Sequence, residues 1–225
     1  TCRLHIAFHG CMQSATDMGR VTGRRDYFAR NAGVNEWADQ NRIVVLYPQA
    51  MPTNAVSGTA IARGASWLRN ALGEAVLPPG FDLREDPHLL RQGNSRLFDA
   101  EGLPTAPRLI VEDGILKGWT LDLATGRKLG MASTASAMRS AGSPPSPGVT
   151  NLELTPGTRT REALIRDMGR GLVVTSMLGA SINATTGDYS RGAAGFWVEN
   201  GEITHAVNEC TIAGNLRDML MRVTA

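Results

Sequence analysis

Two dipeptides, Asp113-Gly114 and Asn200-Gly201, constrain the fold of this 225-residue chain more than any other feature. Asp-Gly and Asn-Gly readily adopt the positive φ angles that a two-residue hairpin turn requires. Each dipeptide stands between two runs rich in apolar and β-branched residues, as paired strands require. The flanking runs are 108–112, 115–119, 195–199 and 202–205. The sequence therefore predicts two β-hairpins, and with them antiparallel pairing.

Helical patterns accompany these hairpins. Apolar residues recur at helical spacing over 160–168, and Gly169 provides a stop. The run 171–178 predicts a buried strand, and 213–221 predicts a last helix. From about residue 55 we therefore expect an α+β domain, dominated by an antiparallel sheet and carrying a few helices.

The first 54 residues have a different pattern. Two short apolar runs, 4–8 and 43–47, flank a stretch with helical character over 18–39. Strand, helix and strand in that order are typical of one parallel α/β unit. We therefore expect a small α/β fragment over 1–54, a second domain over 55–225, and a boundary near Asn54–Ala55.

Composition excludes several classes of function. The net charge is only +2, with 23 basic and 21 acidic side chains, so the chain has no electrostatic footprint for nucleic acid. No run of 18 apolar residues occurs, so we expect no membrane-spanning helix. The four His and three Cys lack the spacing of a zinc motif, and His205 with Glu209 is the nearest approach. We expect no metal site in this chain.

Serine hydrolase chemistry has only partial support. No complete Gly-x-Ser-x-Gly elbow is present. The turn containing His9, Gly10 and Cys11 follows an apolar run and resembles an oxyanion-type turn, in which backbone N–H groups face a developing negative charge. A His-Gly pair is more often an ordinary turn.

A segment dense in small and polar residues, 185–195, is the candidate binding site. Small residues let another backbone approach closely, while acidic, hydroxyl and guanidinium groups supply directional hydrogen bonds. The candidate peptide- or partner-binding residues are Gly187, Asp188, Ser190, Arg191 and Gly195. We expect this segment and the adjoining 195–199 to form a strand edge that pairs with a peptide. A glycine-rich turn leading into a hairpin explains the same residues equally well.

The second domain also resembles a known family. The matching strings are Phe-Asp-Leu-Arg-Glu-Asp-Pro-His at 81–88, Phe-Asp-Ala-Glu-Gly at 98–102, Thr-Gly-Asp-Tyr-Ser-Arg-Gly at 186–192 and Thr-Ile-Ala-Gly-Asn-Leu at 211–216. Together, over about 55–225, they resemble the C-terminal region of the TldD/PmbA metallopeptidase family, in its PmbA (TldE) branch.

The resemblance implies a cytoplasmic bacterial system that cleaves peptides. Its TldD-type subunit carries a metal-binding His-Glu-x-x-x-His helix, which this chain lacks, and pairs with a PmbA-type subunit. The resemblance further implies that the family's N-terminal domain is absent here. We therefore expect a non-catalytic PmbA-type fragment that binds a peptide or its TldD-type partner in a heterodimer, with zinc only in that partner. Whether the chain is itself an enzyme stays open.

Residues 1–54 resemble a different family. The strings Ala-Phe-His-Gly-Cys-Met-Gln-Ser at 7–14 and Ile-Val-Val-Leu-Tyr-Pro-Gln at 43–49 are similar to polyhydroxybutyrate depolymerases, which are α/β-hydrolase esterases. The similarity ends before that family's nucleophile would occur, so the alternative function is an incomplete esterase. We hypothesise that two unrelated gene pieces are fused near Asn54–Ala55.

Overall fold

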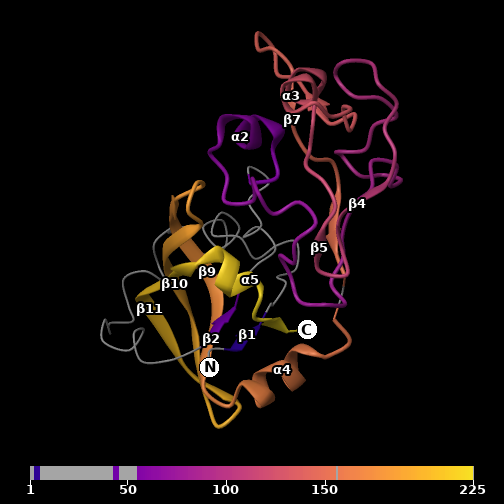
Figure 1. Ribbon diagram of the computed structural model, residues 1–225. Helices are drawn as coiled ribbons and strands as arrows, with labels where there is room; N and C mark the ends of the chain where they lie inside the picture. The colour runs from indigo at the N-terminus through magenta and orange to yellow at the C-terminus, as the bar shows by residue number, and fades with distance from the viewer. Residues whose placement is uncertain (1–2, 6–42, 46–54, 156, 225) are drawn as a thin grey trace. The chain divides into compact units, whose positions relative to one another are not determined.

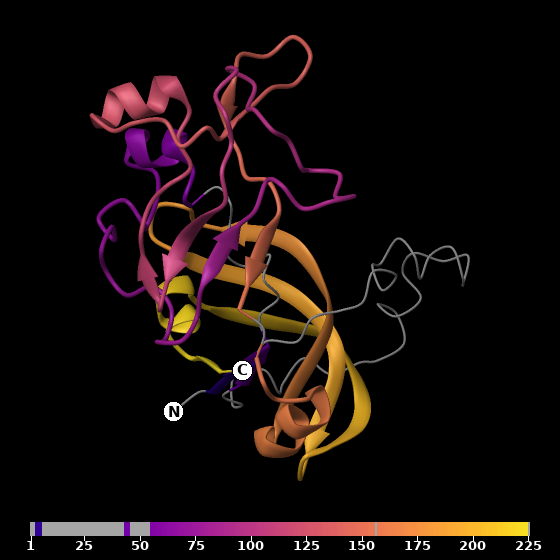
Figure 2. The same ribbon diagram turned by 90° about the vertical axis from the view of Figure 1, so that its right-hand side faces the viewer.

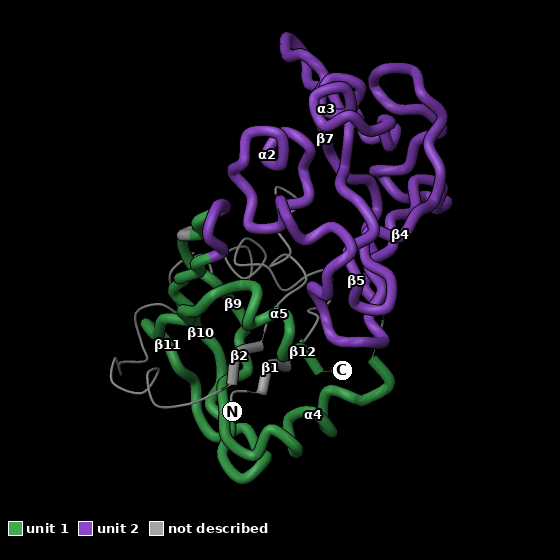
Figure 3. The backbone as a smooth tube through the Cα atoms, viewed as in Figure 1, with its two compact units in different colours: residues 1–50, 156–183, 188–225 green, residues 51–155, 184–187 purple. Residues whose placement is uncertain are grey.

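The computed structural model describes residues 3–5, 43–45, 55–155 and 157–224 (Figure 1). They divide into two compact units (Figure 3). Unit 1 draws on 1–50, 156–183 and 188–225, and unit 2 on 51–155 and 184–187. Pairing is mostly antiparallel and the helices are few, so the predicted α+β class is confirmed. Each unit is defined by packing and combines separate stretches of the chain. The units therefore do not test the domain boundary expected near residue 54, which stays a prediction.

The main sheet of unit 1 has three long antiparallel strands. Their order is β11 (Glu202–Asn215), β10 (Asp188–Glu199) and β9 (Gly171–Ile182), and Figures 1 and 2 show them side by side. The predicted β10–β11 hairpin is confirmed, because Asn200 and Gly201 at its turn have φ angles of 52° and 79°. The strand predicted over 171–178 is the first part of β9.

Within the described residues, two helices belong to unit 1. The predicted helix is confirmed as α4 (Arg161–Met168), where the Thr160 side chain accepts a hydrogen bond from the backbone N–H of Ala163. The helix predicted over 213–221 is shorter, as α5 (Leu216–Leu220). Its first residues remain in β11, where Ala213 pairs with Ser190. Tertiary pairing therefore outweighs the local helical pattern there.

A small parallel sheet completes unit 1. The predicted parallel pair of strands is confirmed as β1 (Arg3–His5) and β2 (Ile43–Val45). β12 (Val223–Thr224) pairs with the other side of β1, which the sequence did not indicate. The helix expected over 18–39 lies outside the described residues.

Unit 2 is built on a four-stranded antiparallel sheet. Its order is β5 (Ile115–Leu116), β4 (Arg108–Glu112), β3 (Leu83–Glu85) and β8 (Leu152–Leu154). The predicted β4–β5 hairpin is confirmed, with φ angles of 47° and 79° at its two turn residues. Its remaining elements are α2 (Gly58–Arg63), α3 (Leu123–Leu129), β6 (Ala137–Met138) and β7 (Ser146–Pro147).

The core of unit 2 consists of side chains from this sheet and from the segment that follows it. Ile110, Val111, Leu116 and Leu121 are completely buried.

Across the described part of the chain, no helix has the length and apolar character needed to span a membrane.

Candidate functional site

The strand that carries most of the candidate binding residues, β10, lies in the middle of its sheet. It pairs with β11 on one side and with β9 on the other. The prediction that this segment forms a free strand edge is therefore wrong, because its backbone groups are engaged by both neighbours. Among the described residues, β9 and β11 are the outer strands of this sheet. Any contact made by β10 must come from its side chains.

Alternation along β10 separates the polar candidates onto two faces. Successive side chains of a strand point to opposite sides of the sheet. Asp188 and Ser190 share one face and are exposed, whereas the buried Tyr189 and the half-buried Arg191 lie on the other face. The Asp188 carboxylate accepts a hydrogen bond from the Asn215 side chain at 3.2 Å. The structure thus brings Asp188 and Ser190 together and places Arg191 opposite.

The two glycine candidates have conformational roles. Gly187 has a φ of 86°, a backbone conformation that L side chains rarely adopt. Gly195 lies where β9 comes close, and a Cβ there would overlap the carbonyl oxygen of Val173. Small residues at these positions are required by the local backbone, so glycine content alone is no indicator of a binding site.

The face of β10 opposite Asp188 and Ser190 carries the predicted candidate Arg191 and also Tyr189, which the sequence prediction did not include. The Tyr189 hydroxyl donates to the Met177 sulfur at 3.1 Å. Burial raises the pKa of Tyr189, although the nearby Arg191 guanidinium acts to lower it. Nε of Arg191 is buried without a hydrogen-bond partner in the described structure. A guanidinium N–H in this situation can bind a carboxylate or carbonyl oxygen.

Cys210, the only cysteine among the described residues, has a structural role. Cys210 is buried, and its sulfur donates to the carbonyl oxygen of Ala193 at 3.0 Å. Burial raises the pKa of the Cys210 thiol. Since the thiolate is the form that attacks substrates and binds metals, this environment disfavours both roles.

The described residues do not fit a zinc ion. Zinc requires at least three protein ligands, and nowhere in the described ranges do three His, Cys, Asp or Glu side chains gather. His205 is exposed and contacts the Thr204 hydroxyl, while His88 contacts the Thr105 hydroxyl at 3.1 Å. The His205–Glu209 pair therefore gains no third ligand from this part of the chain.

The serine hydrolase candidates receive no structural support. His9, Gly10 and Cys11 lie outside the described residues. The sequence Gly-Ala-Ser-Trp-Leu at 64–68 lacks only the second glycine of an elbow, but its Ser66 is buried and donates its hydroxyl to the carbonyl oxygen of Ala55 at 2.6 Å. The same hydroxyl accepts from the backbone N–H of Leu68. It is used in packing and is not presented as a nucleophile.

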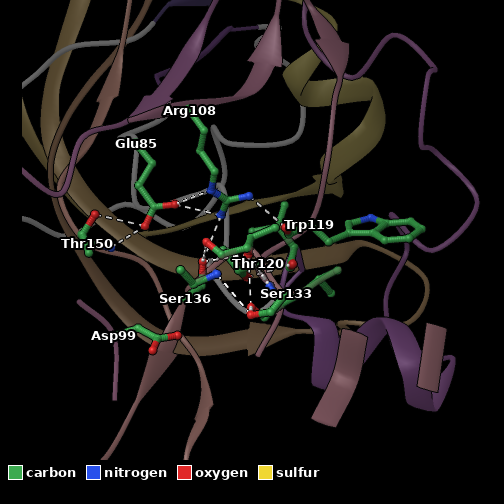
Figure 4. Close-up of polar contacts among 12 residues, drawn as sticks. Glu85, Asp99, Arg108, Trp119, Thr120, Ser133, Ser136 and Thr150 are labelled. Atoms are coloured by element: carbon green, nitrogen blue, oxygen red, sulfur yellow. Dashed lines mark hydrogen bonds and ion pairs between the residues drawn. The ribbon is translucent and has the colours of Figure 1, made fainter. Parts of the chain in front are cut away.

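Unit 2 contains a buried ion pair that sequence analysis did not identify. Figure 4 shows the Arg108 guanidinium meeting Glu85, with Nε and Nη2 at 2.8 and 2.7 Å from one carboxylate oxygen. The other oxygen of Glu85 accepts from the backbone and hydroxyl of Thr150. Arg108 also donates to the Trp119 carbonyl oxygen and the Ser136 hydroxyl. Because Glu85 and Arg108 are held by each other and by several neighbouring groups, this cluster organises the unit.

This α+β domain is of a kind found in a family of metallopeptidases. Residues 45–225 match the family model described as the PmbA/TldA metallopeptidase C-terminal domain. The chain therefore belongs to the PmbA/TldD family, as the strings at 81–88, 98–102 and 186–192 had indicated.

Individual relatives agree with this assignment. The metalloprotease PmbA homolog of Haemophilus influenzae is 48% identical over 172 residues, which cover 76% of this chain and 36% of that protein. The metalloprotease TldD homolog of the same organism is 24% identical over 173 residues, or 76% and 36% of the two chains. The crystal structure of TldE from Thermococcus kodakarensis superposes with a TM-score of 0.67 at 27% identity, covering 76% and 39%. The chain spans little more than a third of the length of these relatives.

Proposed function

We propose that this chain is part of a PmbA-type subunit that binds a peptide or a partner subunit and does not itself catalyse cleavage. The partner is a TldD-type subunit, which holds the zinc, and the pair acts on peptides in the cytoplasm. The observation that carries the proposal is the combination of a PmbA-type sequence with side chains that do not assemble a zinc site in the described ranges. Relatives of both types occur in Haemophilus influenzae, which supports a two-subunit system.

Zinc would supply the hydrolytic chemistry by polarising a carbonyl group and by activating a water molecule. Nothing in the described part of this chain provides the ligands for that step. The contribution of this chain is therefore binding and orientation of the substrate or of the catalytic subunit.

The two faces of β10 suggest two kinds of contact. Asp188 and Ser190 are exposed and offer a carboxylate and a hydroxyl to a neighbouring subunit. On the opposite face, the guanidinium group of the half-buried Arg191 is the side chain suited to bind a carboxylate or carbonyl oxygen of a peptide. Gly187 and Gly195 support these residues by allowing the turn and the close packing of β9 against β10.

The esterase alternative has no specific observation in its favour. The hydroxyl of Ser66 is committed to two backbone contacts, and the oxyanion-type turn lies outside the described residues. We do not propose ester hydrolysis.

Affinity capture with the TldD homolog of Haemophilus influenzae tests the proposal. The full chain should be retained on the immobilised homolog, with the full-length PmbA homolog of that organism as positive control. Ser190→Ala should weaken retention, because it removes an exposed hydroxyl from the proposed contact face. Glu199→Gln, an exposed change at the far end of β10, should not.

Activity measurements on the chain alone complete the test. We expect no cleavage of a labelled casein peptide mixture and no hydrolysis of a p-nitrophenyl ester. Chelator-sensitive peptide cleavage by the chain alone would overturn the non-catalytic assignment, and ester hydrolysis would favour the alternative function. Failure of the TldD homolog to retain the chain would overturn the assigned partner.

A further inference from the structure

The turn between β10 and β11 contains a chemically unstable pair of residues. Asn200 is exposed and is followed directly by Gly201. Asparagine is a thermolabile residue, and a following glycine increases the instability because no side chain shields its backbone nitrogen. The nitrogen of Gly201 can attack the side-chain carbonyl carbon of Asn200, so the position of this nitrogen decides whether the reaction occurs.

The structure holds the Gly201 nitrogen in place. Its N–H donates to the carbonyl oxygen of Gly169, the residue that follows α4, at 2.8 Å. Gly201 is buried although Asn200 is exposed. A Cβ on Gly201 would lie 2.9 Å from both Cα and the carbonyl oxygen of Arg166, in the last turn of α4, so the two backbones are in close contact. Figures 1 and 2 show α4 beside this end of the β10–β11 hairpin.

Both contacts oppose the attack. The nucleophile is the deprotonated amide nitrogen, and an N–H that donates a hydrogen bond gives up its proton less readily. Formation of the new bond also moves the Gly201 nitrogen towards the Asn200 side chain. The hydrogen bond to Gly169 and the packed backbone of Arg166 restrain that movement. The pair is therefore protected while the turn stays against α4.

We propose that Asn200 is a deamidation site that is protected by α4 in the folded chain and reacts when the hairpin turn separates from α4. The Gly201 nitrogen forms a bond to Cγ of Asn200, and the bond from Cγ to Nδ2 breaks. The side-chain nitrogen takes the Gly201 amide proton and leaves as ammonia. Water then opens the cyclic imide at either carbonyl group, which gives aspartate or isoaspartate at position 200.

The two products weaken the turn to different extents. Aspartate before glycine still suits the turn, but its carboxylate stands between Glu199 and Glu202, which are exposed and directly paired across the two strands. Like charges at such positions repel each other. Isoaspartate also adds a methylene group to the main chain, which changes the turn length that sets the register of β10 against β11. The reaction therefore leaves a permanent record that the turn has opened.

Peptide mapping by mass spectrometry, after incubation of the full chain in mildly alkaline buffer, measures deamidation at position 200. The folded chain should react at least about tenfold more slowly than the chain unfolded in guanidinium chloride, because the turn must open first. Thr160→Ala removes the side-chain cap of α4 and should accelerate the reaction of the folded chain about fivefold. The matched control is Asp122→Ala, which removes the cap of α3 in unit 2 and should leave this rate unchanged.

The rates decide between the proposal and its alternatives. A folded chain that deamidates as fast as the unfolded chain would overturn the proposal, and this comparison requires no substitution. An unchanged rate in Thr160→Ala, with the secondary structure retained by circular dichroism, would show that separation from α4 does not control the reaction. Equal acceleration by Thr160→Ala and Asp122→Ala would show that the reaction follows unfolding of the whole chain, which also contradicts the proposal.

Discussion

Gly195 was selected because small residues let another backbone approach closely, and the backbone that approaches it is that of β9. Its position in β10 faces the β9 backbone so closely that a Cβ would lie 2.9 Å from the carbonyl carbon of Val173. Strand glycines commonly mark such close approaches of backbone. The bulge at this point, where the β9–β10 register shifts between Ala194 and Gly195, depends on the absent side chain.

Gly195→Ala should lower the free energy of unfolding by about 2 kcal/mol, because the added methyl group forces the packed backbones apart. The control is Gly192→Ala in the same strand, where a Cβ would meet its nearest neighbour, Leu178, at an ordinary 3.5 Å. Urea denaturation of both variants measures the difference. Equal midpoints would show that β9 can move away without cost.

Cys210 provides a residue-scale prediction on pH. Its pKa is raised by burial above the ordinary value of 9.0, so the folded state keeps the thiol proton that the unfolded state loses first. The resulting stability is present below about pH 9 and is lost as pH rises through that value towards the folded pKa. Cys210→Ala should therefore flatten the fall in unfolding free energy between pH 8 and pH 10, measured by urea titration. An unchanged slope would show that this thiol is not what loses stability in alkali. The raised pKa of Tyr189 acts in the same direction at higher pH, so it should leave a residual slope in the variant.

At the scale of elements, the sequence predicted those helices, strands and hairpins that depend on nearby residues. The β4–β5 and β10–β11 hairpins, the helix α4 and the parallel pair β1–β2 all follow from turn residues, caps and short apolar runs. Two other pairings between distant segments were not predicted. β12 beside β1, and β8 beside β3, join residues far apart in sequence, and neither strand exceeds three residues.

The candidate site shows the same division. The polar residues of β10 could be selected from their types. Whether β10 lies at the edge or in the centre of its sheet depends on its pairing with β9, which these residue types do not indicate. Alternation then separated Arg191 from Asp188 and Ser190.

Strand length leads to a prediction on local stability. β1 and β2 are three residues long, whereas β10 has 12 residues and is paired on both sides. Short strands bury little surface to offset their ordering entropy. Native-state hydrogen exchange should therefore be at least about tenfold faster in β1 and β2 than at the centre of β10. Exchange as slow in β1 and β2 as in β10 would contradict this.

At the scale of the whole molecule, the family match covers most of the chain. The family model begins at residue 45 and continues to residue 225. The fusion hypothesised near Asn54–Ala55 stays a prediction. Amplification across codons 50–60 from source DNA should give one continuous product if the join is natural.

We propose that this chain contributes binding and leaves the metal chemistry to a TldD-type partner. The most direct test of this proposal is elemental analysis of the purified chain after incubation with equimolar zinc and gel filtration. We expect far less than one zinc per chain, because no three zinc ligands gather among the described residues. About one tightly held zinc per chain, together with peptide cleavage that a chelator abolishes, would contradict it.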